Sequence, residues 1–348
     1  MADTHTSFIV KIRHFFLRLF RLNTFPVIKL YPGFGNKSQC YLYGHVLAVS
    51  PKLRNRHRNN FLLNTLALLR LFMVRPIAGA ELRLTYNHKT YFAVSQDDGF
   101  FKFEWDVEVQ LPGNFTALVS LLVKNTTNVI TTAQTSINIP DAGQFIFISD
   151  IDDTFLVSHS GNLRKRLYVL LTKNAHSRKP FEGVVNHYNL LSMSGVDEGK
   201  SAHPFFYVSS SEWNLYDYIK EFSRQNKLPE GVYLLNQLKR ISQVFKTGQN
   251  NHSTKFMRIV RILEAYPEQQ FVLLGDDSQE DPNIYASVVS HFPGKIFSVY
   301  IRQVRNMPKI HVQERIKQME TAGVFCCYFK HSAEAVIHSR TIGLITHV

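Results

Sequence analysis

Carboxylates follow an apolar run near the middle of the chain, where two of them could act on one substrate. The run FIFIS at 145–149 leads into Asp150, Ile151, Asp152, Asp153 and Thr154, a D-x-D-x-T pattern. Asp150 and Asp152 are two residues apart where a strand ends and the chain turns, so both can reach one small site. One can attack an electrophile while the other donates or accepts a proton. A carboxylate attacks a charged phosphate poorly unless a cation offsets the repulsion, and Mg²⁺ with its preference for oxygen ligands suits that role.

Two later segments add polar groups that suit the same chemistry. PFFYVSS at 204–210 carries Ser209, whose hydroxyl could bond a phosphate oxygen or merely cap the following helix. Lys255 lies early in a predicted helix, where a cation is unfavourable beside the helix dipole. A lysine at that position indicates a nearby anion, and the alternative is a solvated surface lysine.

A second acidic cluster follows another apolar run. FVLLG at 271–275 leads into Asp276, Asp277, Ser278, Gln279, Glu280 and Asp281, which gives four acids in six residues. Surface clusters of acids are common, but one directly after a buried strand favours a metal site.

Alternating strands and helices are predicted after residue 144, and these would position the polar groups. Continuous apolar runs at 145–149, 204–210 and 271–275 are typical of strands buried on both faces of a parallel sheet, and 295–301 and 324–329 add two more. Helical patterns lie at 212–225 and 253–266, and 334–345 is predicted to be a closing helix. The region is therefore predicted to be a Rossmann-like, doubly wound α/β domain that binds ligands at the carboxyl ends of its strands.

Period-two alternation dominates the preceding region, from about residue 27 to 140. Short β-like runs at 41–49, 81–86, 89–94, 99–105 and 115–123 are separated by turn signals such as Asp97–Asp98–Gly99. This predicts a small antiparallel β-sandwich-like domain, interrupted at 51–75 by a basic loop and an apolar helix. The predicted division of the chain is 1–28, 29–142 and 143–348. Trp105 and Trp213 are expected to pack in a core or between domains.

Positive charge is concentrated at the N-terminal end. Residues 1–75 hold twelve Lys/Arg and one acid, a net +11 of the chain's +13. This asymmetry points to an anionic partner, either nucleic acid or a membrane surface. Aromatic residues make up 13% of the chain and no tract is of low complexity, which excludes a disordered protein. Three cysteines, two of them adjacent, favour a reducing compartment, and no apolar run reaches the 18–20 residues or so of a membrane span.

Residues 7–22 form an amphipathic pattern. At helical spacing Lys11, His14, Arg18 and Arg21 share a narrow face, opposite apolar residues that include Phe8 and Phe15. The pattern fits a helix that lies in a membrane interface, with a helix packed on the protein's own surface as the alternative.

The motifs together resemble the haloacid-dehalogenase-like phosphatase superfamily, and within it the actin-patch-type phosphatidate phosphatase catalytic domain family. The matching segments are SDIDDT (149–154), FYVSSSEWNLYDYI (206–219) and 271–304. YPGFG (31–35), YGHVL (43–47) and DDGFF (97–101) are similar to the β-rich region that precedes the catalytic domain in that family. The resemblance covers roughly residues 30–345 and leaves the N-terminal segment unplaced.

The resemblance implies a role for each motif residue. Asp150 matches the nucleophile, Asp152 the general acid and base, and Thr154 the residue that steadies the loop. Ser209 matches the phosphate-contacting hydroxyl and Lys255 the neutralising lysine. The Mg²⁺ site would contain Asp150, Asp152, Asp276 and Asp281, with Asp277 as the alternative to Asp281.

The expected function is Mg²⁺-dependent hydrolysis of a phosphomonoester through an aspartyl phosphate. Phosphatidate or a related lipid phosphate is the expected substrate, and an anionic membrane surface the expected partner, with no nucleic acid. We expect a cytoplasmic protein, peripheral at the membrane. The rivals are a phosphatase of soluble or nucleic-acid phosphates and a non-catalytic membrane-binding module.

Overall fold

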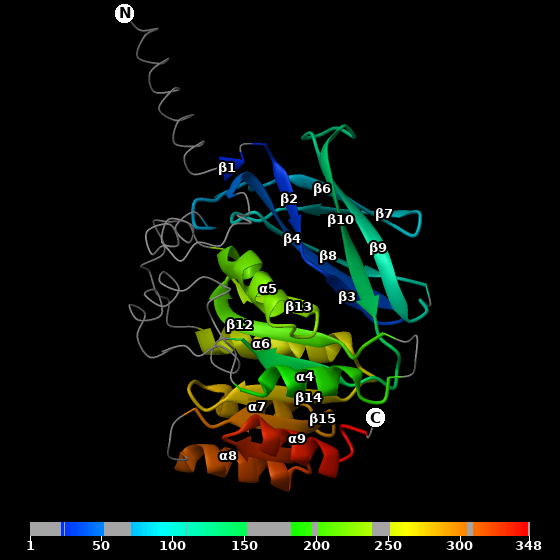
Figure 1. The fold of residues 1–348 in the computed structure, drawn as a ribbon. Coiled ribbons are helices and arrows are strands. Elements are labelled where there is room, and N and C mark those ends of the chain that lie inside the picture. The colour runs from blue at the N-terminus through cyan, green and yellow to red at the C-terminus, as the bar shows by residue number, and fades with distance from the viewer. Residues whose placement is uncertain are drawn as a thin grey trace, which may run out of the picture.

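A computed structural model gives the fold of most of the chain (Figure 1). It describes residues 22–23, 25–51, 71–108, 110–151, 182–196, 201–238, 251–304 and 309–346. Three predicted features fall largely or wholly outside these residues: the amphipathic helix at 7–22, most of the insertion at 51–75, and the turn that carries Asp152 and Thr154. Among the described residues no helix has the length and apolarity that crossing a bilayer requires.

The first sheet is built from the N-terminal region and matches most of the predicted runs. Its strands are β1 (Leu22–Asn23), β2 (Val27–Leu30), β3 (Gly33–Gly35), β4 (Gln39–Pro51), β5 (Arg75–Pro76), β6 (Glu81–Tyr86), β7 (Lys89–Val94), β8 (Phe100–Asp106), β9 (Gly113–Leu122) and β10 (Val129–Ile139). Burial alternates along β6 and β8, as a strand with one face on a core requires.

Pairing in this sheet is antiparallel except at one place. Strands β4, β3, β10, β9, β6 and β7 follow one another across it, and β4 also pairs with β1, β2, β5 and β8. The exception is β3, which pairs with β10 in parallel. The sheet is therefore mixed, and the prediction of a purely antiparallel region was wrong at this pair. The strand β10 was not predicted, because its run of Thr, Gln, Ser and Asn residues lacks a strong apolar alternation.

The second sheet has six strands, all parallel. They are β11 (Ile146–Asp150), β12 (Phe205–Glu212), β13 (Gly231–Asn236), β14 (Phe271–Asp276), β15 (Ile296–Arg302) and β16 (Phe325–Phe329), in the order β13-β12-β11-β14-β15-β16. Every residue of β11 and β14 is buried, as their continuous apolar runs predicted. The strand order changes direction between β11 and β14, the place where open α/β sheets form their ligand crevice.

Helices connect these strands. They are α4 (Val184–Met193), the 3₁₀ turn η1 (Trp213–Leu215), α5 (Tyr216–Gln225), α6 (Asn251–Ala265), α7 (Asp281–His291), α8 (Ile310–Thr321) and α9 (Ser332–Thr341). In Figure 1, α4 and α9 lie together in front of the sheet, while α7 contacts both α6 and α8. The two predicted helices at 212–225 and 253–266 correspond to η1 with α5 and to α6.

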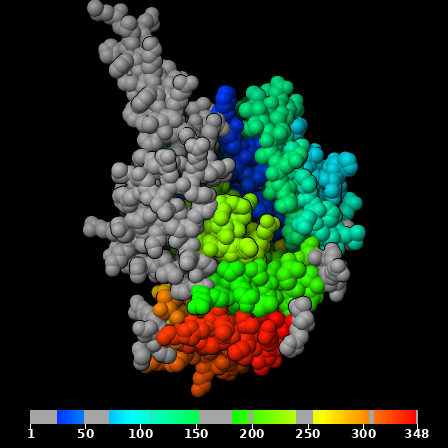
Figure 2. Space-filling model, viewed as in Figure 1, coloured from blue at the N-terminus to red at the C-terminus, as the bar shows by residue number. Residues whose placement is uncertain are grey.

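The two sheets share one core. A cluster of buried side chains from the parallel-sheet region also contains Tyr31, Phe34, Tyr43 and Leu47 from the first sheet. A second cluster fills the first sheet alone and includes Trp105. Figure 2 shows the first sheet's region, in blue to teal, directly against the green part of the parallel-sheet region.

Aromatic stacking joins the two regions at the turn after β12. The ring of Tyr31 stacks on Trp213 with centroids 4.0 Å apart and also contacts Tyr216. Nearby, Lys29 forms an ion pair of 2.7 Å with Asp217. Trp105 and Trp213 thus pack in a core and between regions, as expected from the sequence.

Candidate active site

Three buried carboxylates converge where the strand order reverses. Asp150 ends β11, Asp276 ends β14, and Asp281 is the first residue of α7. Oxygen atoms from all three lie within 4.8 Å of one another, and the three side chains are at most 1% exposed. Strands β11 and β14 pair in parallel, so Asp150 and Asp276 lie at the same edge of the sheet, where both strands end.

Lys255 enters this cluster from α6. Its ammonium group donates a hydrogen bond of 2.7 Å to Asp150 Oδ1 and a second one to Asp281 Oδ1. Burial alone lowers the pKa of Lys255, but the two carboxylates outweigh burial and hold this pKa well above its usual value. The raised pKa favours the charged form of the lysine, and the anion that its helix position indicated is present.

Glycine at the end of β14 makes room for Asp281. A Cβ atom at Gly275 would lie 2.6 Å from Asp281 Oδ2 and 2.8 Å from the hydroxyl of Tyr285. A larger residue at this position would therefore force the Asp281 carboxylate, the Tyr285 ring or the backbone to shift. The first turn of α7 also favours a negative charge at Asp281, because unpaired amides and the helix dipole meet there.

Asp277 faces away from the cluster, toward the neighbouring strands. Its Oδ1 accepts a hydrogen bond of 2.9 Å from the Val304 amide, and its Oδ2 accepts one of 2.8 Å from the Tyr328 hydroxyl. The geometry therefore favours Asp281 over Asp277 as the partner of Asp276. Asp276 Oδ1 itself accepts a bond of 2.6 Å from the Ser278 amide, which fixes the turn.

Ser209 lies beside Asp150 at the same sheet edge. Asp150 pairs with Val208 in register, so Ser209 is one residue beyond it on β12. The Ser209 hydroxyl is fully buried and accepts a hydrogen bond of 2.9 Å from the Ser211 amide. The structure thus brings Asp150, Ser209, Lys255, Asp276 and Asp281 to one edge, while Asp152 and Thr154 lie outside the described residues.

Arg302 is a second buried cation near the cluster that the sequence reasoning missed. It ends β15, is 4% exposed, and donates hydrogen bonds to the Lys330 carbonyl at 3.2 Å and the Ser332 hydroxyl at 2.6 Å. Burial lowers its pKa, and the nearby Tyr188 and Asp276 partly oppose that effect. Its signal in the sequence was a charged residue at the end of an otherwise apolar strand.

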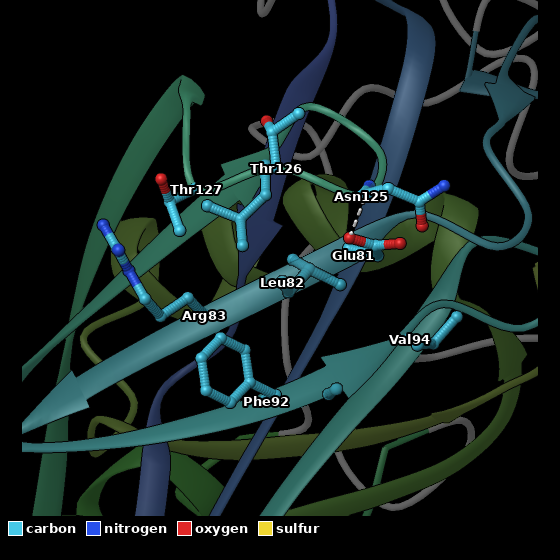
Figure 3. Close-up of a pocket in the computed structure, with 10 residues that line it drawn as sticks. Glu81, Leu82, Arg83, Phe92, Val94, Asn125, Thr126 and Thr127 are labelled. Carbon is cyan, nitrogen blue, oxygen red and sulfur yellow. Dashed lines mark hydrogen bonds between the residues drawn. The ribbon is translucent and has the colours of Figure 1, made fainter.

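A surface cavity of about 520 Å³ lies elsewhere, on the first sheet (Figure 3). Its lining comes from β6, β7 and the β9–β10 connection, and it includes Phe92, Arg83 and Thr126. Within it the Glu81 carboxylate accepts a hydrogen bond of 3.1 Å from the Asn125 amide. None of the acidic cluster lines this cavity, so we place the candidate chemistry at the strand edge.

Residues 145–303 match the profile of a family described as "Phosphatidate phosphatase APP1, catalytic domain". The chain is 29% identical over 162 residues to Phosphatidate phosphatase APP1 of Saccharomyces cerevisiae, which covers 46% of this chain and 26% of that protein. It is 21% identical over 229 residues to the uncharacterized protein C29B5.04c of Schizosaccharomyces pombe, covering 65% and 35%. The chain thus spans about a quarter to a third of the length of these relatives.

Among solved structures, the chain is similar to XAC1771, a carbohydrate acetylesterase from Xanthomonas citri. The identity is 7% and the TM-score 0.34, over 91% of this chain and 75% of that one. A score of this size supports no conclusion about fold or function.

Proposed function

Because residues 145–303 belong to the catalytic-domain family of Phosphatidate phosphatase APP1, we propose that this chain is a Mg²⁺-dependent phosphomonoester hydrolase. The observation that carries the proposal is the buried contact of Lys255 with Asp150 and Asp281 beside Asp276. A buried ion pair is costly to maintain for stability alone, so its placement at a ligand crevice favours chemistry.

The strand order supports a finer assignment of the fold. In chain order the six parallel strands are arranged 3-2-1-4-5-6, as in a doubly wound sheet. We assign the region to the haloacid-dehalogenase-like fold, with the catalytic domain at 143–348 and the β-rich domain at 29–142. The β-rich domain then also takes in β1 and the start of β2, which lie before residue 29 and pair with β4.

Asp150 is the proposed nucleophile. A carboxylate oxygen of Asp150 attacks phosphorus, the bond from phosphorus to the leaving oxygen breaks, and Asp152 in its protonated form donates a proton to that oxygen. Water, deprotonated by the Asp152 carboxylate, then attacks the phosphorus of the aspartyl phosphate, and the bond from phosphorus to the Asp150 oxygen breaks. Orthophosphate leaves, Asp150 is restored as a carboxylate and Asp152 as the protonated acid. Thr154 steadies the loop that carries these two aspartates.

Lys255 and Ser209 bind the phosphoryl group in this proposal. The Lys255 ammonium already contacts Asp150, so it reduces the repulsion between that carboxylate and a phosphate dianion. The Ser209 hydroxyl, one residue beyond the register partner of Asp150, donates to a phosphoryl oxygen.

The described residues fit a divalent cation. Asp150, Asp276 and Asp281 supply three buried carboxylates, and Lys255 supplies one contacting ammonium, which leaves an excess of two negative charges. Oxygen ligands of this kind suit Mg²⁺, and Asp152 is the further proposed ligand. When bound, the ion would neutralise charge on the transferring phosphoryl group.

Phosphatidate or a related lipid phosphate is the proposed substrate. The support is the similarity to Phosphatidate phosphatase APP1 of Saccharomyces cerevisiae, together with the basic region at 1–75, which suits an anionic membrane surface. Because the substrate is a lipid, we propose a membrane surface and no nucleic acid as the partner. A cytoplasmic protein that attaches peripherally to membrane fits this substrate.

The decisive experiment measures phosphate release from phosphatidate in mixed micelles, with Mg²⁺ and then with excess EDTA. We expect release that EDTA stops and that Asp150→Asn lacks. A parallel panel of soluble sugar, aryl and nucleotide phosphates separates the two phosphatase classes. Preference for the soluble panel would move the assignment away from lipids, and vesicle binding without any phosphate release would identify a non-catalytic module.

A further inference from the structure

Pairing between β12 and β13 is interrupted where Ser209 lies. The register runs regularly from Phe205 to Val208 and resumes at Glu212, which pairs with Asn236. Ser209 is therefore in the irregular stretch between these two pairings. Irregularities of this kind bend a strand and re-aim a side chain, and they recur next to active sites. Such a stretch needs contacts other than the ladder to hold one conformation.

Arg258 makes such contacts from α6. Its Nη1 donates a hydrogen bond of 3.1 Å to the Ser209 carbonyl, and its Nη2 donates one of 3.2 Å to Asn236 Oδ1. One guanidinium group therefore joins the carboxyl ends of both strands across the interruption. Arg258 is three residues after Lys255, so the two cations share one helix face that is turned toward the strand ends.

We propose that Arg258 is a positioning residue that holds the irregular end of β12 so that the Ser209 hydroxyl meets the substrate phosphate. The inference rests on the proposed function, because Ser209 is taken there as the phosphate-contacting hydroxyl. It adds a residue that neither the motif pattern nor the acidic cluster contains.

The chemistry of the guanidinium fits this task better than an ammonium group does. Burial, and secondarily the charge of Arg261, lower the pKa of Arg258 to about 10, so the group remains protonated at neutral pH. Its planar fork presents two donors in fixed directions, which matches two acceptors on different strands. A lysine would keep the charge and reach only one acceptor well.

A double-mutant cycle on kcat/KM tests the inference with the full chain. Arg258→Met is expected to lower kcat/KM about 10–100-fold, the usual scale for a residue that orients a contacting group. Added to Ser209→Ala, the same substitution should cost less than about 2-fold, because its target is already absent. Arg258→Lys should recover part of the loss. Full additivity of the two substitutions, or wild-type kcat/KM in Arg258→Met, would overturn the proposal.

Two controls separate positioning from folding and from general charge. Arg261→Met removes an exposed arginine one turn further along α6, and it should leave kcat/KM within about 2-fold of wild type. Asn236→Ala removes one of the two acceptors and should reproduce part of the Arg258→Met loss. If Arg258→Met unfolds, the cycle is measured with Arg258→Lys instead.

A binding measurement distinguishes failure of this inference from failure of the proposed function. Orthophosphate binding in the presence of Mg²⁺ is followed by calorimetry for the wild type and the three variants of the cycle. If no substrate is hydrolysed but Arg258→Met and Ser209→Ala weaken orthophosphate binding non-additively, the proposed function fails and the positioning role stands. Additive weakening, or no orthophosphate binding by the wild type, would overturn the positioning role.

Discussion

Acidic residues lie on the exposed face of β8 in the first sheet and are buried at the ends of β11 and β14 in the second. Along β8 every second residue is exposed, and Lys102, Glu104 and Asp106 all lie on that exposed face. Along β11 and β14 every residue is buried, and the acids Asp150 and Asp276 end these strands with at most 1% exposure. A half-buried strand leaves its charges in water, where they interact weakly. A strand buried on both faces places its terminal acid in a buried site. There the carboxylate needs a cation as its partner, and its interactions are stronger than in water.

The first prediction compares one substitution in both regions. Asp150→Asn should reduce turnover by about 10⁴-fold or more, because the proposed nucleophile is lost. Asp106→Asn, on the exposed face of β8, should leave turnover within about 2-fold of wild type. Phosphate release from an aryl phosphate measures both. Substantial turnover by Asp150→Asn, in protein free of host phosphatases, would remove Asp150 as nucleophile.

The second prediction concerns two lysines that form ion pairs of different burial. Lys255→Met leaves Asp150 and Asp281 buried without their cation, which should destabilise the metal-free protein by about 3–5 kcal/mol. Lys29→Met removes an ion pair whose side chains are each 24% exposed, and it should cost about 1 kcal/mol or less. Urea unfolding in EDTA measures both values.

The same two lysine variants should also differ in how much added Mg²⁺ stabilises them against unfolding. The loss of Lys255 raises the excess negative charge of the cluster, so Mg²⁺ should stabilise Lys255→Met more than it stabilises the wild type. For Lys29→Met the gain should equal that of the wild type. Equal Mg²⁺ effects in all three proteins would place the metal away from Asp150 and Asp281.

Sequence patterns predicted most of the parallel strands, but they missed β13 and did not indicate which distant strands pair. The runs that became β11, β12, β14, β15 and β16 were recognised because continuous apolar stretches bounded by polar turns leave few alternatives. β13 was missed although it is no shorter than β11 or β16, because GVYLLN follows directly on the segment Lys-Leu-Pro-Glu without a run of polar residues that would mark its start. The parallel pairing of β3 with β10 joins residues about a hundred positions apart, and nothing local encodes it.

In the candidate site, too, some residues could be predicted from the sequence and others could not. Asp150, Asp276 and Lys255 were found from strand ends and helix position, because topology alone brings those places together. The choice between Asp277 and Asp281 was beyond the sequence, since it depends on Val304 and Tyr328 taking the Asp277 oxygens. Arg258 was missed because its acceptors are a backbone carbonyl and a side chain on two other strands.

The third prediction measures how much the aromatic contacts between the two regions contribute to stability. Tyr31 is buried against Trp213 and Tyr216, so Tyr31→Ala should destabilise the protein by about 3–5 kcal/mol, as large aromatic truncations do. Tyr31→Phe keeps the ring and loses the 2.9 Å hydrogen bond with His45 Nδ1, at a cost of about 1 kcal/mol. Urea unfolding followed by tryptophan fluorescence measures both. If Tyr31→Ala costs no more than Tyr31→Phe, the stacking contributes little to the junction.

The last prediction uses one buried histidine from each region as a reporter. Burial, and secondarily the charge of Lys29, lowers the pKa of His45 to about 3. Burial, and secondarily the charges of Arg302 and His338, lowers the pKa of His187 to about 3 as well. An unfolded histidine takes up its proton near pH 6.5. Between these values the unfolded chain binds more protons, so stability should fall as the pH drops below 6.5. From pH 7 to 5 each histidine should contribute a loss of about 2 kcal/mol.

Replacement of either histidine by glutamine should therefore reduce this loss, and the pattern of unfolding shows how the regions are coupled. Because Tyr31, Phe34 and Tyr43 extend the parallel-sheet core into the first sheet, we expect a single transition on which His45→Gln and His187→Gln have similar effects. Urea unfolding at pH 7 and pH 5, followed by circular dichroism, measures the difference. Two transitions, each sensitive to only one of the substitutions, would show that the sheets unfold as separate units and that their shared aromatic core is a contact surface between domains. An unchanged pH dependence in His45→Gln would mean that the folded protein protonates this histidine in its buried position.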